Sequence, residues 1–159
     1  MRSLLAFAVV MVCGAACMPP PDYTTTSGVD VYDSEHRSSA EEVQAWLEII
    51  IEKAPEDEAR VRTFKEVYDG TTITITSEEE VSATCVRRHS AACAVGATKN
   101  ILVPWLECPL YLNTASALGH EVGHLMGYHH DEGGKGGPWF DSETKAGVQF
   151  YVYKDVCGL

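Results

Sequence analysis

Residues 120–130 constrain the fold of this chain more than any other stretch. They read H-E-V-G-H-L-M-G-Y-H-H, with histidines four residues apart at positions 120 and 124. Residues with this spacing share one face of an α-helix, so a helix here lets the two imidazoles converge on one point. Gly127 can adopt the positive φ that ends such a helix. The chain can then reverse and bring His130 to the same point.

The flanking sequence also predicts a helix, over residues 114–126. Asn113 or Thr114 can cap its N-terminus. The apolar residues that can pack inward from it are Ala115, Ala117, Leu118, Val122, Leu125 and Met126.

The residue types in the motif are those of a catalytic zinc site. Such a site has three protein ligands and one open position, whereas a structural zinc site is closed by four ligands. The three ligands of one Zn²⁺ ion would be His120, His124 and His130. Glu121 could reach a metal-bound water without being a ligand, and would act as general base. Zinc lowers the pKa of bound water to about 7, so the pattern predicts peptide-bond hydrolysis without a covalent intermediate.

At these residues the chain resembles the metzincin clan of zinc endopeptidases. The three histidines match the clan's ligands, Glu121 its general base and Gly127 its turn glycine. Asp131 matches the residue after the third histidine in the adamalysin-like members. The resemblance implies an α+β fold, with a twisted mixed sheet, an active-site helix and a C-terminal helix. It also implies a protein or peptide substrate lying along the edge strand of the sheet, where we expect residues 94–98 to contact it.

The chain departs from the clan in one respect. Metzincins carry a methionine in a turn beneath the metal, C-terminal to the third histidine. Here the methionines are at positions 1, 11, 18 and 126. Residues 133–140 fall where this turn would be, and Trp139 or Phe140 is the candidate for a hydrophobic floor. The departure bears on subfamily and on activity more than on zinc binding, because the methionine is not a ligand.

The N-terminus has the pattern of an export signal. Arg2 precedes an apolar run over residues 4–12, and the small residues 14–16 precede Cys17. The run is too short to span a membrane. Small residues before a cysteine also resemble a bacterial lipoprotein signal, although Gly14 stands where leucine is usual.

We therefore expect an exported protein with one folded domain. It would be either lipid-anchored in the cell envelope through Cys17 or simply secreted, and we expect a monomer. The expected segments are a signal peptide over residues 1–16, a lipidated, flexible tether over residues 17–28 and a catalytic domain over residues 29–159.

Four further cysteines follow Cys17. An even set in an exported protein predicts two disulfides, for which three pairings exist. We favour Cys85–Cys93, which closes a short loop, and Cys108–Cys157, which ties the C-terminus to the segment before the motif helix. Zinc ligation by these cysteines is not expected, because no C-x-x-C spacing occurs.

The chain is acidic, with 23 Asp and Glu against 12 Lys and Arg. Removal of residues 1–16 would take away only Arg2 among the charged side chains and leave a formal charge of −12. Nucleic acid and anionic lipid surfaces favour a basic face, so charge argues against both as partners. Solubility is the simplest reason for this excess of negative charge. The alternative is that the protein prefers basic peptides as substrates.

Other elements follow from local patterns. The expected strands are 29–32, 71–76 (T-T-I-T-I-T), 91–98 and 101–105. A first helix would open at Ser38 or Ser39, with Glu41 and Glu42 placed for a capping box, and would bury Val43, Trp46, Leu47 and Ile50. A further helical turn is expected after Pro55, a turn at Asp69-Gly70 and a solvated loop at Glu78–Glu80. Asp141 or Ser142 would cap a last helix carrying Val148, Phe150, Tyr151 and Tyr153, whose tyrosines would pack or line a specificity pocket.

Two alternatives to a peptidase remain open. One is a non-enzymatic zinc-binding lipoprotein, which the missing methionine favours and the intact Glu121 opposes. The other is a different H-E-x-x-H enzyme with Asp131 or Glu132 as third ligand. His129 also competes with His130 for that position, but the spacing favours His130.

Overall fold

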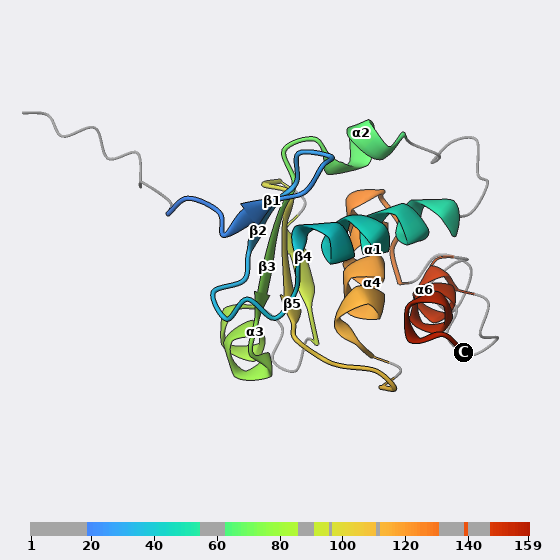
Figure 1. The fold of residues 1–159 in the computed structure, drawn as a ribbon. Coiled ribbons are helices and arrows are strands. Elements are labelled where there is room, and N and C mark those ends of the chain that lie inside the picture. The colour runs from blue at the N-terminus through green and yellow to red at the C-terminus, as the bar shows by residue number, and fades with distance from the viewer. Residues whose placement is uncertain are drawn as a thin grey trace, which may run out of the picture.

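A computed structural model describes residues 19–54, 63–85, 91–95, 97–110, 112–130, 139 and 147–159. This part of the chain forms an α+β fold with a five-stranded mixed sheet and five helices (Figure 1). The predicted fold class is therefore confirmed. The signal sequence, Cys17 and the helical turn expected after Pro55 lie outside the described residues.

The sheet has the strand order β1-β2-β3-β5-β4. Strands β2, β3 and β5 are parallel, and the two outer strands run antiparallel to their neighbours. The bounds are Tyr23–Thr24 (β1), Asp30–Tyr32 (β2), Thr72–Thr76 (β3), Cys93–Val95 (β4) and Asn100–Pro104 (β5).

The four predicted strands are present. Strands β2, β3 and β4 are shorter than expected, and β5 keeps the expected length but begins one residue earlier. Residues Tyr23–Thr24, expected in the tether, instead pair with β2 as strand β1. Isoleucines alternate with threonines along β3, and the isoleucines are buried. In the register of the parallel strands, Val31 lies beside Ile73 and Ile73 beside Ile101, which gives one face of the sheet an apolar row.

Helix α1 (Ala40–Glu52) begins as predicted. The Ser39 hydroxyl accepts a hydrogen bond from the Glu42 amide, and the predicted stripe of Val43, Trp46, Leu47 and Ile50 is buried. The short helix α2 (Phe64–Tyr68) begins with a capping box between Thr63 and Glu66, and Gly70 follows it with a φ of 69° at the predicted turn.

The prediction for Glu78–Glu80 is wrong. These residues form the first turn of helix α3 (Glu78–Thr84), capped by Ser77, whose hydroxyl accepts from the Glu80 amide. Carboxylates in a first turn interact favourably with the helix dipole, so the acidic run that suggested a loop in fact suits a helix N-terminus.

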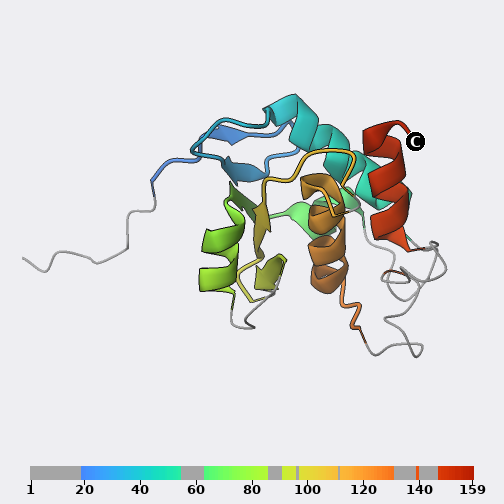
Figure 2. The ribbon, with the colours of Figure 1, turned by 90° about the horizontal axis from the view of Figure 1, so that it is seen from below.

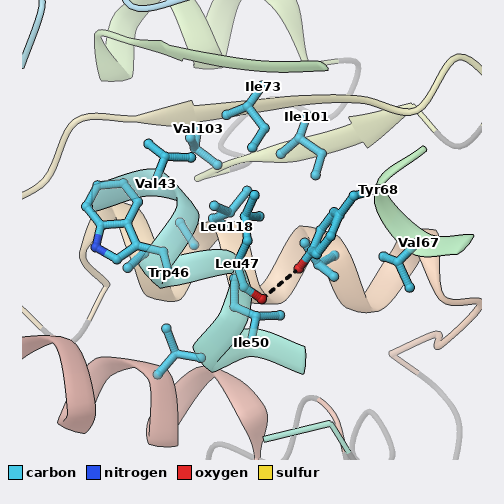
Figure 3. Close-up of a cluster of buried hydrophobic side chains, with 14 of the residues drawn as sticks. Val43, Trp46, Leu47, Ile50, Val67, Tyr68, Ile73, Ile101, Val103 and Leu118 are labelled. Atoms are coloured by element: carbon cyan, nitrogen blue, oxygen red, sulfur yellow. Dashed lines mark hydrogen bonds between the residues drawn. The ribbon is translucent and has the colours of Figure 1, made fainter. Parts of the chain in front are cut away.

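Helices lie on both sides of the sheet. Figures 1 and 2 show α1 and α4 (Thr114–Leu125) against one face, with α6 (Val148–Cys157) beyond them, and α3 on the other face. The main core lies between the sheet and α1 and α4 (Figure 3). There the Tyr68 hydroxyl donates to the Leu47 carbonyl at 3.3 Å, which joins α2 to α1.

Two disulfides confirm the predicted pairing. Cys85–Cys93 joins the end of α3 to the start of β4, and Cys108–Cys157 joins the segment before α4 to the end of α6. Disulfides are compatible with an exported protein. No helix in the described ranges has the length and apolar character needed to cross a membrane.

The predicted cap of the last helix is wrong. Helix α6 starts after Gly147, with no side-chain cap, whereas Asp141 and Ser142 fall outside the described residues. Its buried residues are Val148, Gln149 and Val152, while Tyr151 is 41% exposed. Of the residues expected on this helix, Val148 packs inward and Tyr151 does not.

Candidate metal centre

Helix α4 carries the motif and has well-defined ends. Asn113 caps it, with its side-chain oxygen accepting from the Ser116 amide at 2.8 Å. At the other end the Gly127 amide donates to the His124 carbonyl at 3.1 Å, and the Tyr128 amide to the Gly123 carbonyl at 3.0 Å. Gly127 has a φ of 90°. This is a Schellman ending, so the predicted glycine turn is confirmed.

The turn brings the three predicted histidines together. Nitrogen atoms of His120, His124 and His130 all lie within 4.8 Å of one another, and Nε2 of His124 is 3.1 Å from Nε2 of His130. Tetrahedral zinc with bonds of about 2.0–2.1 Å would hold its nitrogen ligands about 3.3 Å apart. The cluster therefore has a size that fits one such ion, with small side-chain adjustments.

Two hydrogen bonds set the orientation of the imidazoles on α4. Nδ1 of His124 lies 3.1 Å from the Tyr128 carbonyl oxygen, and Nδ1 of His120 lies 3.3 Å from Oε1 of Gln149. Both oxygens are acceptors, so each contact is a hydrogen bond when Nδ1 carries the ring proton, and that tautomer leaves the lone pair of Nε2 for a metal. The donor set and the tautomers thus fit a metal that prefers imidazole, although they do not identify it.

Burial governs the charges of the motif helix. Burial, and then the neighbouring imidazole of His124, lower the pKa of His120 to about 4. A ligand imidazole must be neutral, and His120 is neutral at pH 7. Burial raises the pKa of Glu121 to about 7, although the Ala94 amide donates a hydrogen bond to its carboxylate and favours the charged form.

The cluster opens into a cleft of about 1090 Å³ between α4 and the edge strand β4. Among the described lining residues, the only acidic or basic side chains besides histidine belong to Glu121. The Cys85–Cys93 disulfide also lines the cleft. The described lining thus offers no anionic subsite beyond Glu121 that would recognise a basic peptide.

Strand β4 supplies part of the expected substrate-contact segment. Ala94 and Val95 line the cleft, whereas Ala97 and Thr98 do not, and Gly96 is outside the described residues. Ala94 lies beside Ile101 in the sheet register, so its side chain faces α4 and the core. The backbone amide that donates to the Glu121 carboxylate therefore belongs to β4, an edge strand of the sheet.

The other candidate residues have different places. His129 is exposed and lines the cleft, but the described cluster contains His130 instead. Tyr151 and Tyr153 do not line the cleft; the Tyr153 hydroxyl donates to the Pro109 carbonyl at 2.9 Å. Asp131 and Glu132, the alternative carboxylate ligands, lie outside the described residues.

Trp139 packs against helix α4 at Gly119 and Gly123. Its side chain is fully buried, and its indole N–H donates to the Gly119 carbonyl at 2.8 Å. A Cβ added at Gly123 would lie 2.2 Å from Trp139 Nε1, so the ring occupies the space that a side chain at position 123 would fill. Tyr128 packs beside it, with ring centroids 5.1 Å apart. The structure therefore places one of the two floor candidates, Trp139, directly against α4.

Gln149 could not be predicted from the sequence as part of the site. A glutamine in a predicted helix carries no signal of a site, because its link to His120 spans 29 residues and depends on how α6 packs against α4. The glycines at positions 119 and 123 could have indicated close packing on one helix face, but not the residue that packs there.

Comparisons with known proteins do not identify a family for this chain. A scan of protein-family models finds no match to this chain, and searches of curated proteins and solved structures find none.

Proposed function

We propose that this protein is a zinc-dependent endopeptidase in which His120, His124 and His130 hold one zinc ion and Glu121 is the general base. The observation that carries the proposal is the position of Glu121, a buried carboxylate that lines the same cleft as three imidazoles able to hold a metal. A closed structural site would need a fourth protein ligand and no cleft. The resemblance of the motif to metzincins then favours peptide bonds among hydrolysable substrates.

A zinc ion held there would supply Lewis-acid chemistry, polarising a carbonyl group and lowering the pKa of a water ligand to about 7. The protein's own contribution is to place a proton acceptor in the cleft. One carboxylate oxygen of Glu121 would take the proton of the attacking water and later deliver it to the leaving amine. The Ala94 amide holds that carboxylate towards the edge strand.

The edge strand is also the place where a substrate backbone would bind. Strand β4 pairs with β5 on one side only, and its residues line the cleft. An extended peptide could add to it as a further strand through main-chain hydrogen bonds. Apart from Glu121 and the histidines, the described lining carries no acidic or basic side chain, which favours substrates with neutral side chains around the cleaved bond.

The proposal includes export. The basic start, short apolar run and small residues before Cys17 support a signal peptide, with lipidation of Cys17 as the anchor. Both disulfides need an oxidising compartment to persist.

The alternative is a non-enzymatic zinc-binding protein, supported by the lack of any methionine after His130. A pure metal holder would have no need for a buried carboxylate such as Glu121 in its cleft, which is why we place it second.

Zinc content and cleavage of a mixed peptide library would separate the two functions. The purified protein is compared with Glu121→Gln and with the control Glu41→Gln, at an exposed carboxylate on α1. We expect one zinc in all three, and chelator-sensitive cleavage in all but Glu121→Gln. One zinc in each without any cleavage would favour the non-enzymatic function. No zinc in the unmodified protein would overturn both.

A further inference from the structure

Gln149 is a polar side chain that the proposed chemistry does not use. It comes from α6, is 9% exposed and places Oε1 3.3 Å from Nδ1 of His120. A buried amide needs hydrogen-bond partners, and this one, which also lines the cleft, lies against a residue of the metal cluster.

The contact has a direct consequence for the imidazole. A neutral histidine carries one ring proton, and an acceptor at Nδ1 keeps the proton there. Nε2 then holds the lone pair that a metal needs. The Tyr128 carbonyl does the same for His124, but it lies in the turn that follows α4, whereas Gln149 reaches His120 from a separate helix.

Helix α6 is fixed well enough to position that amide. Val152 is buried and lies next to Gly119, where an added Cβ would be 3.5 Å from it. At the far end Cys157 forms its disulfide with Cys108, and the side-chain nitrogen Nδ2 of Asn113 lies 3.0 Å from Cys157 Sγ. The cap of α4 and the end of α6 are therefore joined.

We propose that Gln149 is a positioning residue of the metal centre, which orients His120 and fixes its Nδ1–H tautomer so that Nε2 faces the ion. This inference rests on the proposed function, because it assumes that His120 binds a metal. Partners of this kind, which hydrogen-bond to a ligand without touching the metal, typically change metal affinity by about 10- to 100-fold.

The test uses zinc affinity, measured by competition with a coloured chelator, and ¹⁵N NMR of the His120 ring. Gln149→Met keeps the length of the side chain and removes the acceptor, whereas Gln149→Glu keeps an oxygen acceptor. The control is Gln44→Met, the same change on α1 away from the cleft. We expect Gln149→Met to bind zinc about 10- to 100-fold more weakly, Gln149→Glu to recover most of the loss and Gln44→Met to match the unmodified protein.

The tautomer gives a test that needs no variant. In the folded, metal-free protein we expect the His120 proton on Nδ1, and in Gln149→Met a shift towards Nε2. A proton on Nε2 in the unmodified protein, or equal zinc affinity of Gln149→Met and the unmodified protein, would overturn the positioning role while leaving the metal centre intact. If the unmodified protein binds no zinc, the proposed function fails instead.

Discussion

Gly123 should be the most sensitive glycine of the motif helix. A Cβ at this position would lie 2.2 Å from Nε1 and 2.3 Å from Cδ1 of Trp139, far inside contact distance. The ring cannot move away without losing its hydrogen bond to the Gly119 carbonyl, because both groups are buried. Gly123→Ala therefore forces either the helix or the indole to shift.

Three effects set the size of the loss. Alanine is favoured over glycine inside a helix by about 1 kcal/mol, which stabilises the variant. Overpacking costs about 1–3 kcal/mol, and a buried indole N–H left without its acceptor costs about 1–3 kcal/mol. The two costs outweigh the gain, so we expect the free energy of unfolding to fall by about 3 kcal/mol. For a domain of this size that lowers Tm by about 10 °C.

Gly119→Ala is the matched control. Its Cβ would lie 3.4 Å from Ile50 and 3.5 Å from Val152, close to ordinary contact distances, one turn earlier on the same helix. We expect this variant to be as stable as the unmodified protein or up to about 1 kcal/mol more stable. Thermal and urea unfolding of the metal-free proteins, followed by circular dichroism, measure both.

A double variant isolates the contact itself. In a Trp139→Leu background the indole is gone, so Gly123→Ala should no longer destabilise the protein. The double-mutant cycle of these two substitutions should therefore give a coupling free energy of about 2 kcal/mol or more. If Gly123→Ala is as stable as Gly119→Ala, the packing of Trp139 on Gly123 does not constrain α4, contrary to this prediction.

Three further predictions follow from the site and the disulfides. His130→Ala should abolish tight zinc binding, whereas His129→Ala should retain it, and competition with a chelator measures both affinities. Loss of zinc binding in His129→Ala but not in His130→Ala would mean that His129 is the ligand. Cys157→Ser opens a disulfide with a sequence separation of 49, and Cys93→Ser opens one with a separation of 8. Because a longer loop gives the unfolded chain more entropy, we expect the free energy of unfolding in urea to fall by about 4 kcal/mol for Cys157→Ser and by about 2.5 kcal/mol for Cys93→Ser. Equal losses of free energy in the two variants would contradict this expectation. Burial raises the pKa of Glu121 to about 7, so its contribution to the stability of the metal-free protein is present below about pH 4.5 and lost as pH rises through 7. Glu121→Gln should thus gain stability relative to the unmodified protein between pH 5 and pH 8, and a difference in Tm that does not change with pH would refute the shift.

Local patterns were sufficient for the motif helix and its turn. The cap, the apolar spacing and the positive-φ glycine all act within a few residues. The sequence therefore predicts a cap at Asn113 or Thr114, the turn at Gly127 and the position of His130. The strand over Thr72–Thr76 follows for the same reason, since its alternation has a period of two. The four cysteines after Cys17 left only three pairings, and the short loop between Cys85 and Cys93 favoured the one that the structure shows.

Local patterns did not predict the structure where the same residues suit two kinds of secondary structure. Glu78–Glu80 suits a solvated loop and the first turn of a helix equally well, and Ser77 decides for the helix. The last helix has polar residues upstream that could cap it, yet it starts at a glycine. Tyr23–Thr24 forms a strand only because β2 lies beside it.

The sequence alone predicts the candidate metal cluster, because helix periodicity brings His120 and His124 together and one glycine favours His130 as the third member. Only the tertiary structure decides what surrounds them. Gln149 meets His120 because α6 packs on α4, and Trp139 occupies the groove at Gly123. These contacts join segments that are far apart in the chain, and their geometry depends on how helices pack, which no short-range pattern encodes.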